Sequence, residues 1–226
     1  KGDGARAEVT AMTHSELFNG ATDTRVFLYG DGTNKTIYSG IDSDTGLASA
    51  DYFPDLYEAA IGEENTPITA LVRHHARLLA FKTDSAWSVQ YATMTLDNGV
   101  TTSAFYVTPV NRQLGNEALG QVRLVENNPL TLDGGTIYQW RSTSTSGNIT
   151  DSEQNAKRIS DRVHVALESF SLPDTKTFNS KTQHEFWFFY GGMALVLNYT
   201  NDTWYFYTNM PFEQKLEVER DVLGLK

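Results

Sequence analysis

The chain has 226 residues and a mass of 25.2 kDa, with 28 acidic and 18 basic side chains and a formal net charge of −10. This charge argues against a protein that binds nucleic acid or an anionic membrane through a broadly basic surface. Zero cysteines exclude a disulfide scaffold, a cysteine-ligated zinc site and thiol catalysis. The longest apolar run, residues 186–190, is far shorter than the ~20 residues that a membrane-spanning helix needs.

The length of the chain fits one all-β domain, so we expect residues 1–226 to form a single unit. Because the first residue is Lys1 and no signal-peptide pattern is present, we expect a fragment or part of a longer chain. Four N-x-Thr sequons are typical either of surface glycosylation or of chance, since Asn suits turns and Thr suits strands. We favour chance for these sequons, at Asn34, Asn148, Asn198 and Asn201.

Short segments rich in β-branched and aromatic residues dominate the chain, and clusters of Gly, Asn, Asp and Ser separate them. In chain order, the clearest predicted strands are residues 25–29, 77–81, 102–107, 185–190, 194–199 and 204–208. Turn chemistry occurs at residues 30–32, 97–99, 133–135 and 200–203. The pattern therefore predicts an antiparallel all-β fold.

One region has helical rather than strand periodicity. Apolar residues recur at helical spacing from Ile159 to Phe170, Asp151 or Ser152 can cap the first turn, and Pro173 follows. We therefore predict one inserted helix near residues 152–170, preceded by a loop at 141–147, and a shorter helical turn at 54–61.

An internal repeat suggests the architecture. Residues 79–87, 130–138 and 196–204 align without gaps as an apolar strand, a polar turn and an aromatic that opens the next strand. A looser copy runs from Phe27 to Tyr38, so the four copies start 52, 51 and 66 residues apart. Units of about 50 residues are typical of β-propeller blades, although a two-sheet sandwich could show the same hairpins. We favour an antiparallel β-propeller, complete or partial, in which the aromatics fill the space between blades.

Histidine and acidic residues give no metal-binding pattern. None of the five histidines has metal-ligand spacing, and adjacent His74 and His75 should face opposite sides of an extended chain. The Asp42-Ser-Asp44-Thr-Gly46 segment resembles the start of a calcium loop but lacks the later ligands, which favours a polar turn.

Paired carboxylates for glycoside hydrolysis and aromatic platforms for sugars are the remaining chemical possibilities. The carboxylate candidates are equally explained as a solvated acidic face, and blade packing explains two of the tryptophans, Trp87 and Trp204. These candidates are Asp51, Asp55, Glu63, Glu64 and Asp84 for the carboxylates, and Trp87, Trp140, Trp187 and Trp204 for the platforms. We assign no catalytic, cofactor-binding or metal-binding residue.

Several stretches, taken in order, resemble β-propeller structural proteins of tailed bacteriophages, of the tail-hub or head–tail DNA-stabilisation type. The resembling stretches are residues 24–30, 38–39, 50–54, 65–71, 77–87, 128–138, 159–163 and 193–205. They follow that family's order over residues 15 to 210, and their order is the specific part of the match.

The resemblance implies a non-enzymatic virion structural protein, located in the phage tail or head–tail region, without cofactor or active site. It implies other virion proteins and copies of itself in a ring as partners, and no small-molecule substrate, sequence-specific nucleic acid or membrane. Two alternatives stay open, a carbohydrate- or receptor-binding module and a glycosidase-type propeller enzyme. The strands at 185–190 and 194–199 are too apolar to face water on both sides, so we expect another blade, domain or copy to cover them.

Overall fold

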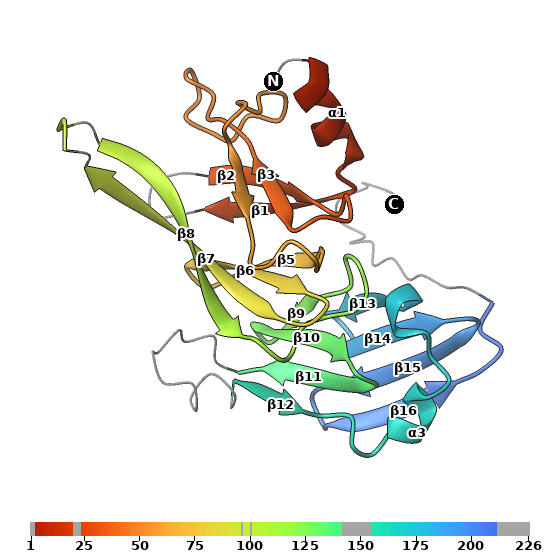
Figure 1. Ribbon diagram of the computed structural model, residues 1–226. Coiled ribbons are helices and arrows are strands. Elements are labelled where there is room, and N and C mark those ends of the chain that lie inside the picture. The colour runs from red at the N-terminus through yellow and green to blue at the C-terminus, as the bar shows by residue number, and fades with distance from the viewer. Residues whose placement is uncertain (1–2, 20–23, 96, 100, 142–154, 212–226) are drawn as a thin grey trace, which may run out of the picture.

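The chain folds into four sheets of four antiparallel strands each (Figure 1). The computed structural model describes residues 3–19, 24–95, 97–99, 101–141 and 155–211. In every sheet the strands are neighbours in the order in which they follow along the chain, so each sheet is a simple meander. This arrangement confirms the predicted β-propeller, and we call the sheets blades I to IV.

The blades divide the chain into consecutive segments. Blade I comprises β1 (His14–Asn19), β2 (Thr24–Tyr29), β3 (Lys35–Tyr38) and β4 (Glu58–Ala60). Blade II comprises β5 (Ile68–His74), β6 (Arg77–Lys82), β7 (Ala86–Thr95) and β8 (Thr101–Asn111). Blade III comprises β9 (Arg123–Val125), β10 (Asn128–Asp133), β11 (Thr136–Trp140) and β12 (Ala156–Arg158). Blade IV comprises β13 (Lys176–Ser180), β14 (Glu185–Tyr190), β15 (Met193–Asn198) and β16 (Thr203–Tyr207).

Apolar contacts join each blade to the next one along the chain. Phe27 of blade I and Leu78 of blade II share one cluster, and Phe81 of blade II and Trp140 of blade III share the next. Leu132 of blade III and Phe186 of blade IV belong to a third. Because blades are buried on both faces, their middle strands are nearly continuous apolar runs rather than alternating ones.

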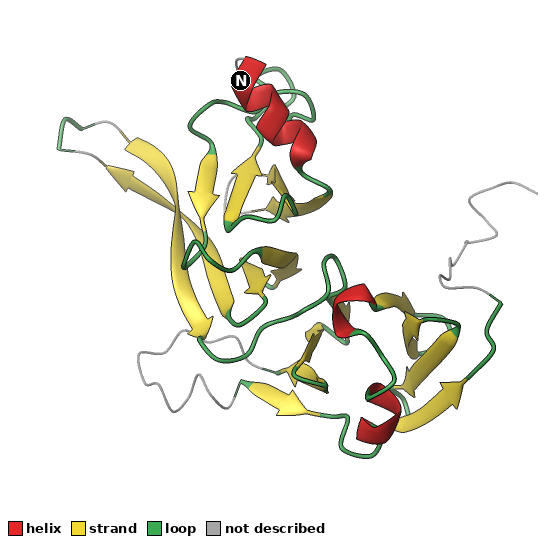
Figure 2. Ribbon diagram, turned by 45° about the vertical axis from the view of Figure 1, so that its right-hand side comes forward, coloured by secondary structure: helices red, strands yellow, loops and turns green. Residues whose placement is uncertain are grey.

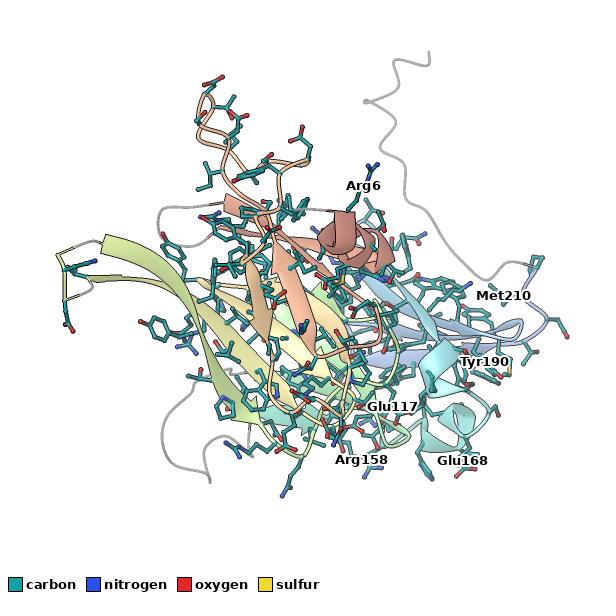
Figure 3. All side chains as sticks on the ribbon, turned by 45° about the horizontal axis from the view of Figure 1, so that its top comes forward. Arg6, Glu117, Arg158, Glu168, Tyr190 and Met210 are labelled. Atoms are coloured by element: carbon teal, nitrogen blue, oxygen red, sulfur yellow. The ribbon has the colours of Figure 1, made fainter. Side chains whose placement is uncertain are left out.

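The outer face of blade IV differs from the other blade faces. Its buried residues Phe189, Ala194 and Val196 form a cluster with Phe178, Trp187 and Met210, without any described residue of blade I. Met210 also ties the chain to the β14–β15 turn, since its N–H donates to the carbonyl of Gly192 at 2.8 Å (labelled in Figure 3). Residues on both faces of β14 and β15 are therefore buried, and blade III packs against one of these faces.

The repeated hairpins correspond to blade elements, but they are not the same pair of strands in every blade. Residues 79–87 and 130–138 span the second and third strands of blades II and III, whereas residues 196–204 span the third and fourth strands of blade IV. The matching hairpin in blade IV is β14–β15, which turns at Gly191–Gly192 as β10–β11 turns at Gly134–Gly135. A strand–turn–aromatic pattern recurs at every hairpin of a meander, so the pattern alone does not identify which hairpin is repeated.

The predicted helix at 152–170 is mostly wrong. Residues 152–154 lie outside the described residues, 156–158 form β12, and only α3 (His164–Leu167) is α-helical. The pairing of β12 with β11 outweighs the local periodicity, because it completes the fourth strand of blade III. The helical turn predicted at 54–61 is only partly present: the N–H of Tyr57 donates to the carbonyl of Pro54 at 3.0 Å, but residues 58–60 form β4, which pairs with β3.

Helices make a small contribution to the structure (Figure 2). The sequence did not indicate α1 (Asp3–Ala11), which leads into β1 through a bond from the N–H of Thr13 to the carbonyl of Tyr29, 3.1 Å long. A 3₁₀ turn, η1 (Leu172–Asp174), follows α3 and connects blade III to blade IV.

Candidate functional site

A cavity of about 1010 Å³ lies among the first strands of the four blades, and we call it the axial cavity. Residues of the first strands of all four blades line it, and these strands lie nearest the centre of the molecule (Figure 1). Its basic side chains are Arg73 of β5, Arg123 of β9, Lys176 of β13 and Lys181 just after β13. Glu16 is the only carboxylate among the lining residues, so this axial cavity is basic although the chain is acidic overall.

In one wall of the axial cavity, the backbone of Gly120 lies close against the side chain of His14. Gly120 has a φ of +70°, and a Cβ at this position would lie 2.3 Å from Nε2 of His14. Its N–H donates to the carbonyl of Thr69 at 2.7 Å, and its carbonyl accepts from Nη1 of Arg123 at 2.8 Å. Arg123 also donates to the carbonyl of Val122 at 3.0 Å, which fixes the guanidinium at the wall.

Burial and the two arginines set the charge of the other titratable groups in the axial cavity. Burial raises the pKa of Glu16, while Arg123 and Arg73 act in the opposite direction. Burial and the neighbouring Arg123 both lower the pKa of His14. At neutral pH the lowered pKa favours an uncharged His14, and Glu16 is the only carboxyl group among the lining residues.

Gln121 is the most unusual polar residue of the axial cavity. It is 2% exposed, and neither Oε1 nor Nε2 of its side chain has a hydrogen-bond partner among the described residues. The backbone carbonyl of Gln121 accepts a hydrogen bond from the hydroxyl of Thr177. The side-chain amide of nearby Asn179 donates to the backbone carbonyl of Leu124 at 2.8 Å. Blades III and IV are thus joined by polar contacts, whereas the Gln121 amide itself stays unpaired.

The sequence did not point to this cavity. Arg73, Arg123 and Lys176 are about 50 residues apart and share no motif. They meet because each lies on the first strand of its blade. Correct blade boundaries would have been the signal, since the first strands of propeller blades line the axis.

The two adjacent histidines lie together rather than on opposite sides, so the expected geometry was wrong. Their ring centroids are 4.3 Å apart, because His75 adopts a φ of +54° in the β5–β6 turn and is not extended. Burial is the main cause that lowers the pKa of His74, with a further contribution from His75. Across the described ranges, no group of three or more His, Asp and Glu side chains is placed to hold a metal ion.

The Asp42–Asp44 segment is a polar turn, as predicted. Oδ1 of Asp42 accepts from the N–H groups of Asp44 and Thr45 at 2.9 and 2.8 Å, and from the Thr45 hydroxyl at 3.0 Å. These bonds, above all those from Thr45, lower the pKa of the Asp42 carboxyl.

The five carboxylates considered for hydrolysis are all exposed, which is consistent with solvated surface groups. They are Asp51, Asp55, Glu63, Glu64 and Asp84. Of the sequon asparagines, Asn198 makes a local contact that suits a turn, whereas Asn34 contacts a residue 28 positions along the chain. Asn198 Oδ1 accepts from the N–H of Thr200 at 3.2 Å, and the buried Asn34 donates to the carbonyl of Gly62 at 3.2 Å. Asn148 lies outside the described residues.

Three of the four tryptophans pack in clusters between blades. Trp140 is fully buried between blades II and III, Trp87 packs in the cluster of blades I and II, and Trp204 packs in that of blades III and IV. The prediction that blade packing explains Trp87 and Trp204 is therefore confirmed. Trp187 instead lies on the outer face of blade IV, stacked on Tyr207 with ring centroids 5.8 Å apart.

A long ribbon formed by β7 and β8 is the second notable feature. The two strands pair from Ala86–Asn111 as far as Thr95–Thr101, whereas β6 pairs with β7 only up to Val89. Beyond Val89 the ribbon is two-stranded, and it projects away from the blades (Figure 1). Phe105 anchors its base on blade I through edge contacts to Phe27 and Tyr38, with centroids 5.1 and 4.8 Å apart.

No protein-family model matches the chain, and a search of curated proteins also gives no match. Among solved structures, the chain is similar to the crystal structure of the hemopexin fold protein CP4 from cow pea. The similarity has 12% sequence identity and a TM-score of 0.31, over 80% of this chain and 83% of that chain. In the part of the chain that the structure describes, no helix is long and apolar enough to cross a membrane.

Proposed function

We propose that the protein is a non-enzymatic structural subunit of a phage virion, in the tail or head–tail region, that acts through protein–protein assembly. The β7–β8 ribbon is the observation that carries this proposal. An isolated two-stranded ribbon is marginally stable in water, and its free edges present backbone groups to which another strand can pair. A neighbouring protein that adds a strand or packs on this ribbon would stabilise it.

The composition of the ribbon supports a contact role. Asp97 is the only charged residue between Ala86 and Asn111, and Tyr106 is 45% exposed on its surface. Charged side chains, especially Lys, are the usual protection of an edge strand against pairing with other chains. The ribbon lacks this protection, which suits a segment that is covered in an assembly. Its partners would be copies of the same chain in a ring, or other virion proteins.

A truncation that follows the strand register tests this proposal. Tyr91 and Phe105 are directly opposite each other, so an Asn-Gly turn can replace residues 92–104 and keep the aromatic anchor on blade I. We expect the truncated protein to retain its fold by circular dichroism and thermal melting. We also expect it to lose the oligomers that the full chain forms in sedimentation, and to be absent from purified particles. Leu56→Ala, at a side chain 88% exposed on another loop, is the control and should assemble normally.

The interface gives a second criterion. Each contact in the assembled ring should bury more than ~1,200 Å² in total, the range of stable complexes. Incorporation of the truncated protein at the level of the full chain would refute a role for the ribbon. A full chain that stays monomeric at every concentration and is missing from particles would refute the assembly function itself.

One observation favours a second candidate, a carbohydrate-binding module. On the outer face of blade IV, Trp187 stacks on Tyr207, and Tyr205 and Tyr207 are 44% and 42% exposed. Aromatic faces of this kind stack on sugar rings. Retention on immobilised glycans that is lost in Tyr207→Ala, together with a monomeric full chain, would support this candidate over the assembly subunit.

A further inference from the structure

We propose that the axial cavity binds a multivalent oxyanion, a molecule with several phosphate or carboxylate groups. Four basic side chains and one carboxylate line the cavity, in a chain whose net charge is −10. The basic groups come from three blades, so they surround the cavity rather than forming a stripe on one surface. Such a concentration of one charge in a cavity attracts ions of opposite charge more strongly than the same groups spread over the surface.

The Gln121 amide is the second, independent observation. A buried polar side chain normally has a hydrogen-bond partner, because an unpaired one costs free energy. Gln121 lines the axial cavity, is 2% exposed, and has no partner for either amide atom among the described residues. Both amide atoms are shielded from the cavity in this conformation, so the side chain must rotate before an oxyanion can accept from its Nε2–H₂ group.

Arg123 is held in a geometry that suits such a ligand. Its Nη1 donates to the carbonyls of Gly120 and Val122, so the guanidinium is already positioned before a ligand arrives. The guanidinium has five N–H donors in a planar fork, and those on Nε and Nη2 have no partner among the described residues. Arginine donors in this arrangement match the paired oxygens of a phosphate or a carboxylate.

The size of the axial cavity indicates a ligand with more than one charged group. A volume of about 1010 Å³ is at the upper end of the range for small-molecule sites and far exceeds that of one inorganic ion. Glu16 interacts electrostatically with Arg73 and Arg123, so it offsets part of their charge but leaves the lining of the cavity with a net positive charge. We therefore expect the oxyanion groups to lie toward Arg73, Arg123, Lys176 and Lys181, with Gln121 beside them.

Calorimetry with tripolyphosphate on the full chain at low salt tests the proposal. We expect saturable binding with one site per chain, and a rise in melting temperature with ligand concentration. The double variant Arg73→Gln/Lys181→Gln should raise the Kd about tenfold or more, since each lost cation removes a charge-assisted contact. Both side chains are exposed, so these substitutions leave the core intact. Arg112→Gln, which removes one positive charge at an exposed site outside the cavity, should alter the Kd less than about twofold.

Gln121→Leu separates binding from a structural role. Because the amide has no partner, this variant should melt at or above the temperature of the unchanged protein, yet bind tripolyphosphate more weakly. Citrate distinguishes the two ligand chemistries: binding of both molecules supports a general multivalent oxyanion site, and binding of tripolyphosphate alone supports a phosphate site. Absence of saturable binding to either molecule, or an equal loss in Arg112→Gln, would overturn the proposal.

Discussion

Removal of the Trp140 side chain should strongly destabilise the protein, because this residue joins blades II and III. Trp140 is fully buried, and its ring meets that of Phe81 edge-on with centroids 5.2 Å apart. Its indole N–H donates to the hydroxyl of Thr131 at 2.9 Å, and Thr131 is also fully buried. Trp140→Ala should therefore lower the free energy of unfolding by about 3–5 kcal/mol, the usual range for deletion of a buried aromatic.

Smaller substitutions divide this loss between packing and hydrogen bonding. Trp140→Phe leaves the Thr131 hydroxyl without its partner, and Thr131→Val leaves the indole N–H without its acceptor. Each single variant should lose about 1–3 kcal/mol, because an unpaired buried polar group keeps its desolvation cost. The double variant removes both polar groups, so its loss should fall short of the sum of the two by about 1 kcal/mol or more.

Urea denaturation followed by fluorescence and circular dichroism measures these free energies. Leu56→Ala, at an 88% exposed side chain, is the control and should change stability by less than about 0.5 kcal/mol. Strict additivity of the two single variants would refute the proposed hydrogen bond. A loss below about 1 kcal/mol in Trp140→Ala would refute the packing of blades II and III around this residue.

Two further predictions concern the segment that links blades II and III. Gly115→Ala should lower the free energy of unfolding by about 3 kcal/mol or more in urea denaturation, because the new Cβ would lie 2.1 Å from the carbonyl oxygen of Lys82. Gly32→Ala is the control: its Cβ would lie in open space, so it should cost only the backbone strain of about 1–2 kcal/mol. Equal losses in the two variants would refute the clash at Gly115. Burial raises the pKa of Asp133 above its ordinary value of 3.8, which means that the folded protein favours the protonated carboxyl. The resulting contribution to the free energy of unfolding is fully present below pH 3.8 and is lost as the pH rises through the higher pKa of the folded state. Asp133→Asn should therefore gain stability relative to the unchanged protein from about pH 4 to about pH 7 in urea midpoints, and a constant difference across this range would contradict the shift.

Strands and turns could be predicted because their residues carry local chemistry. Leu78–Phe81 is apolar and β-prone, and the Gly134–Gly135 pair supplies the positive φ values of the β10–β11 turn. The number of sheets also followed from the hairpin repeat. Which hairpin was repeated could not be inferred, since every hairpin in a meander has the same pattern. The repeat copy in blade IV consequently covers β15 and β16, one hairpin later than the copies in blades II and III.

Errors occurred where contacts distant in sequence outweigh local preference. Residues 156–158 lie in a stretch of helical periodicity but complete blade III as β12. His75 was expected to be extended, yet the β5–β6 turn places it at positive φ against His74. The basic axial cavity arises in the same way, because only ring formation brings Arg73 and Arg123 together. Local propensity reports neighbours along the chain, and these features depend on neighbours in space.

The distribution of charge links the two proposals and gives them opposite dependence on salt. Copies of a chain with a net charge of −10 repel one another, and salt weakens this repulsion over a screening length of about 10 Å at 0.1 M. The ribbon has only Asp97 as a charged residue, so contacts through it do not depend on attraction between charges that salt would screen. Association of copies through the ribbon should therefore strengthen, or stay constant, as salt is added. Oxyanion binding at Arg73, Arg123, Lys176 and Lys181 relies on opposite charges, so it should weaken under the same conditions. If assembly weakened with salt in parallel with tripolyphosphate binding, the basic cavity rather than the ribbon would be the contact between copies.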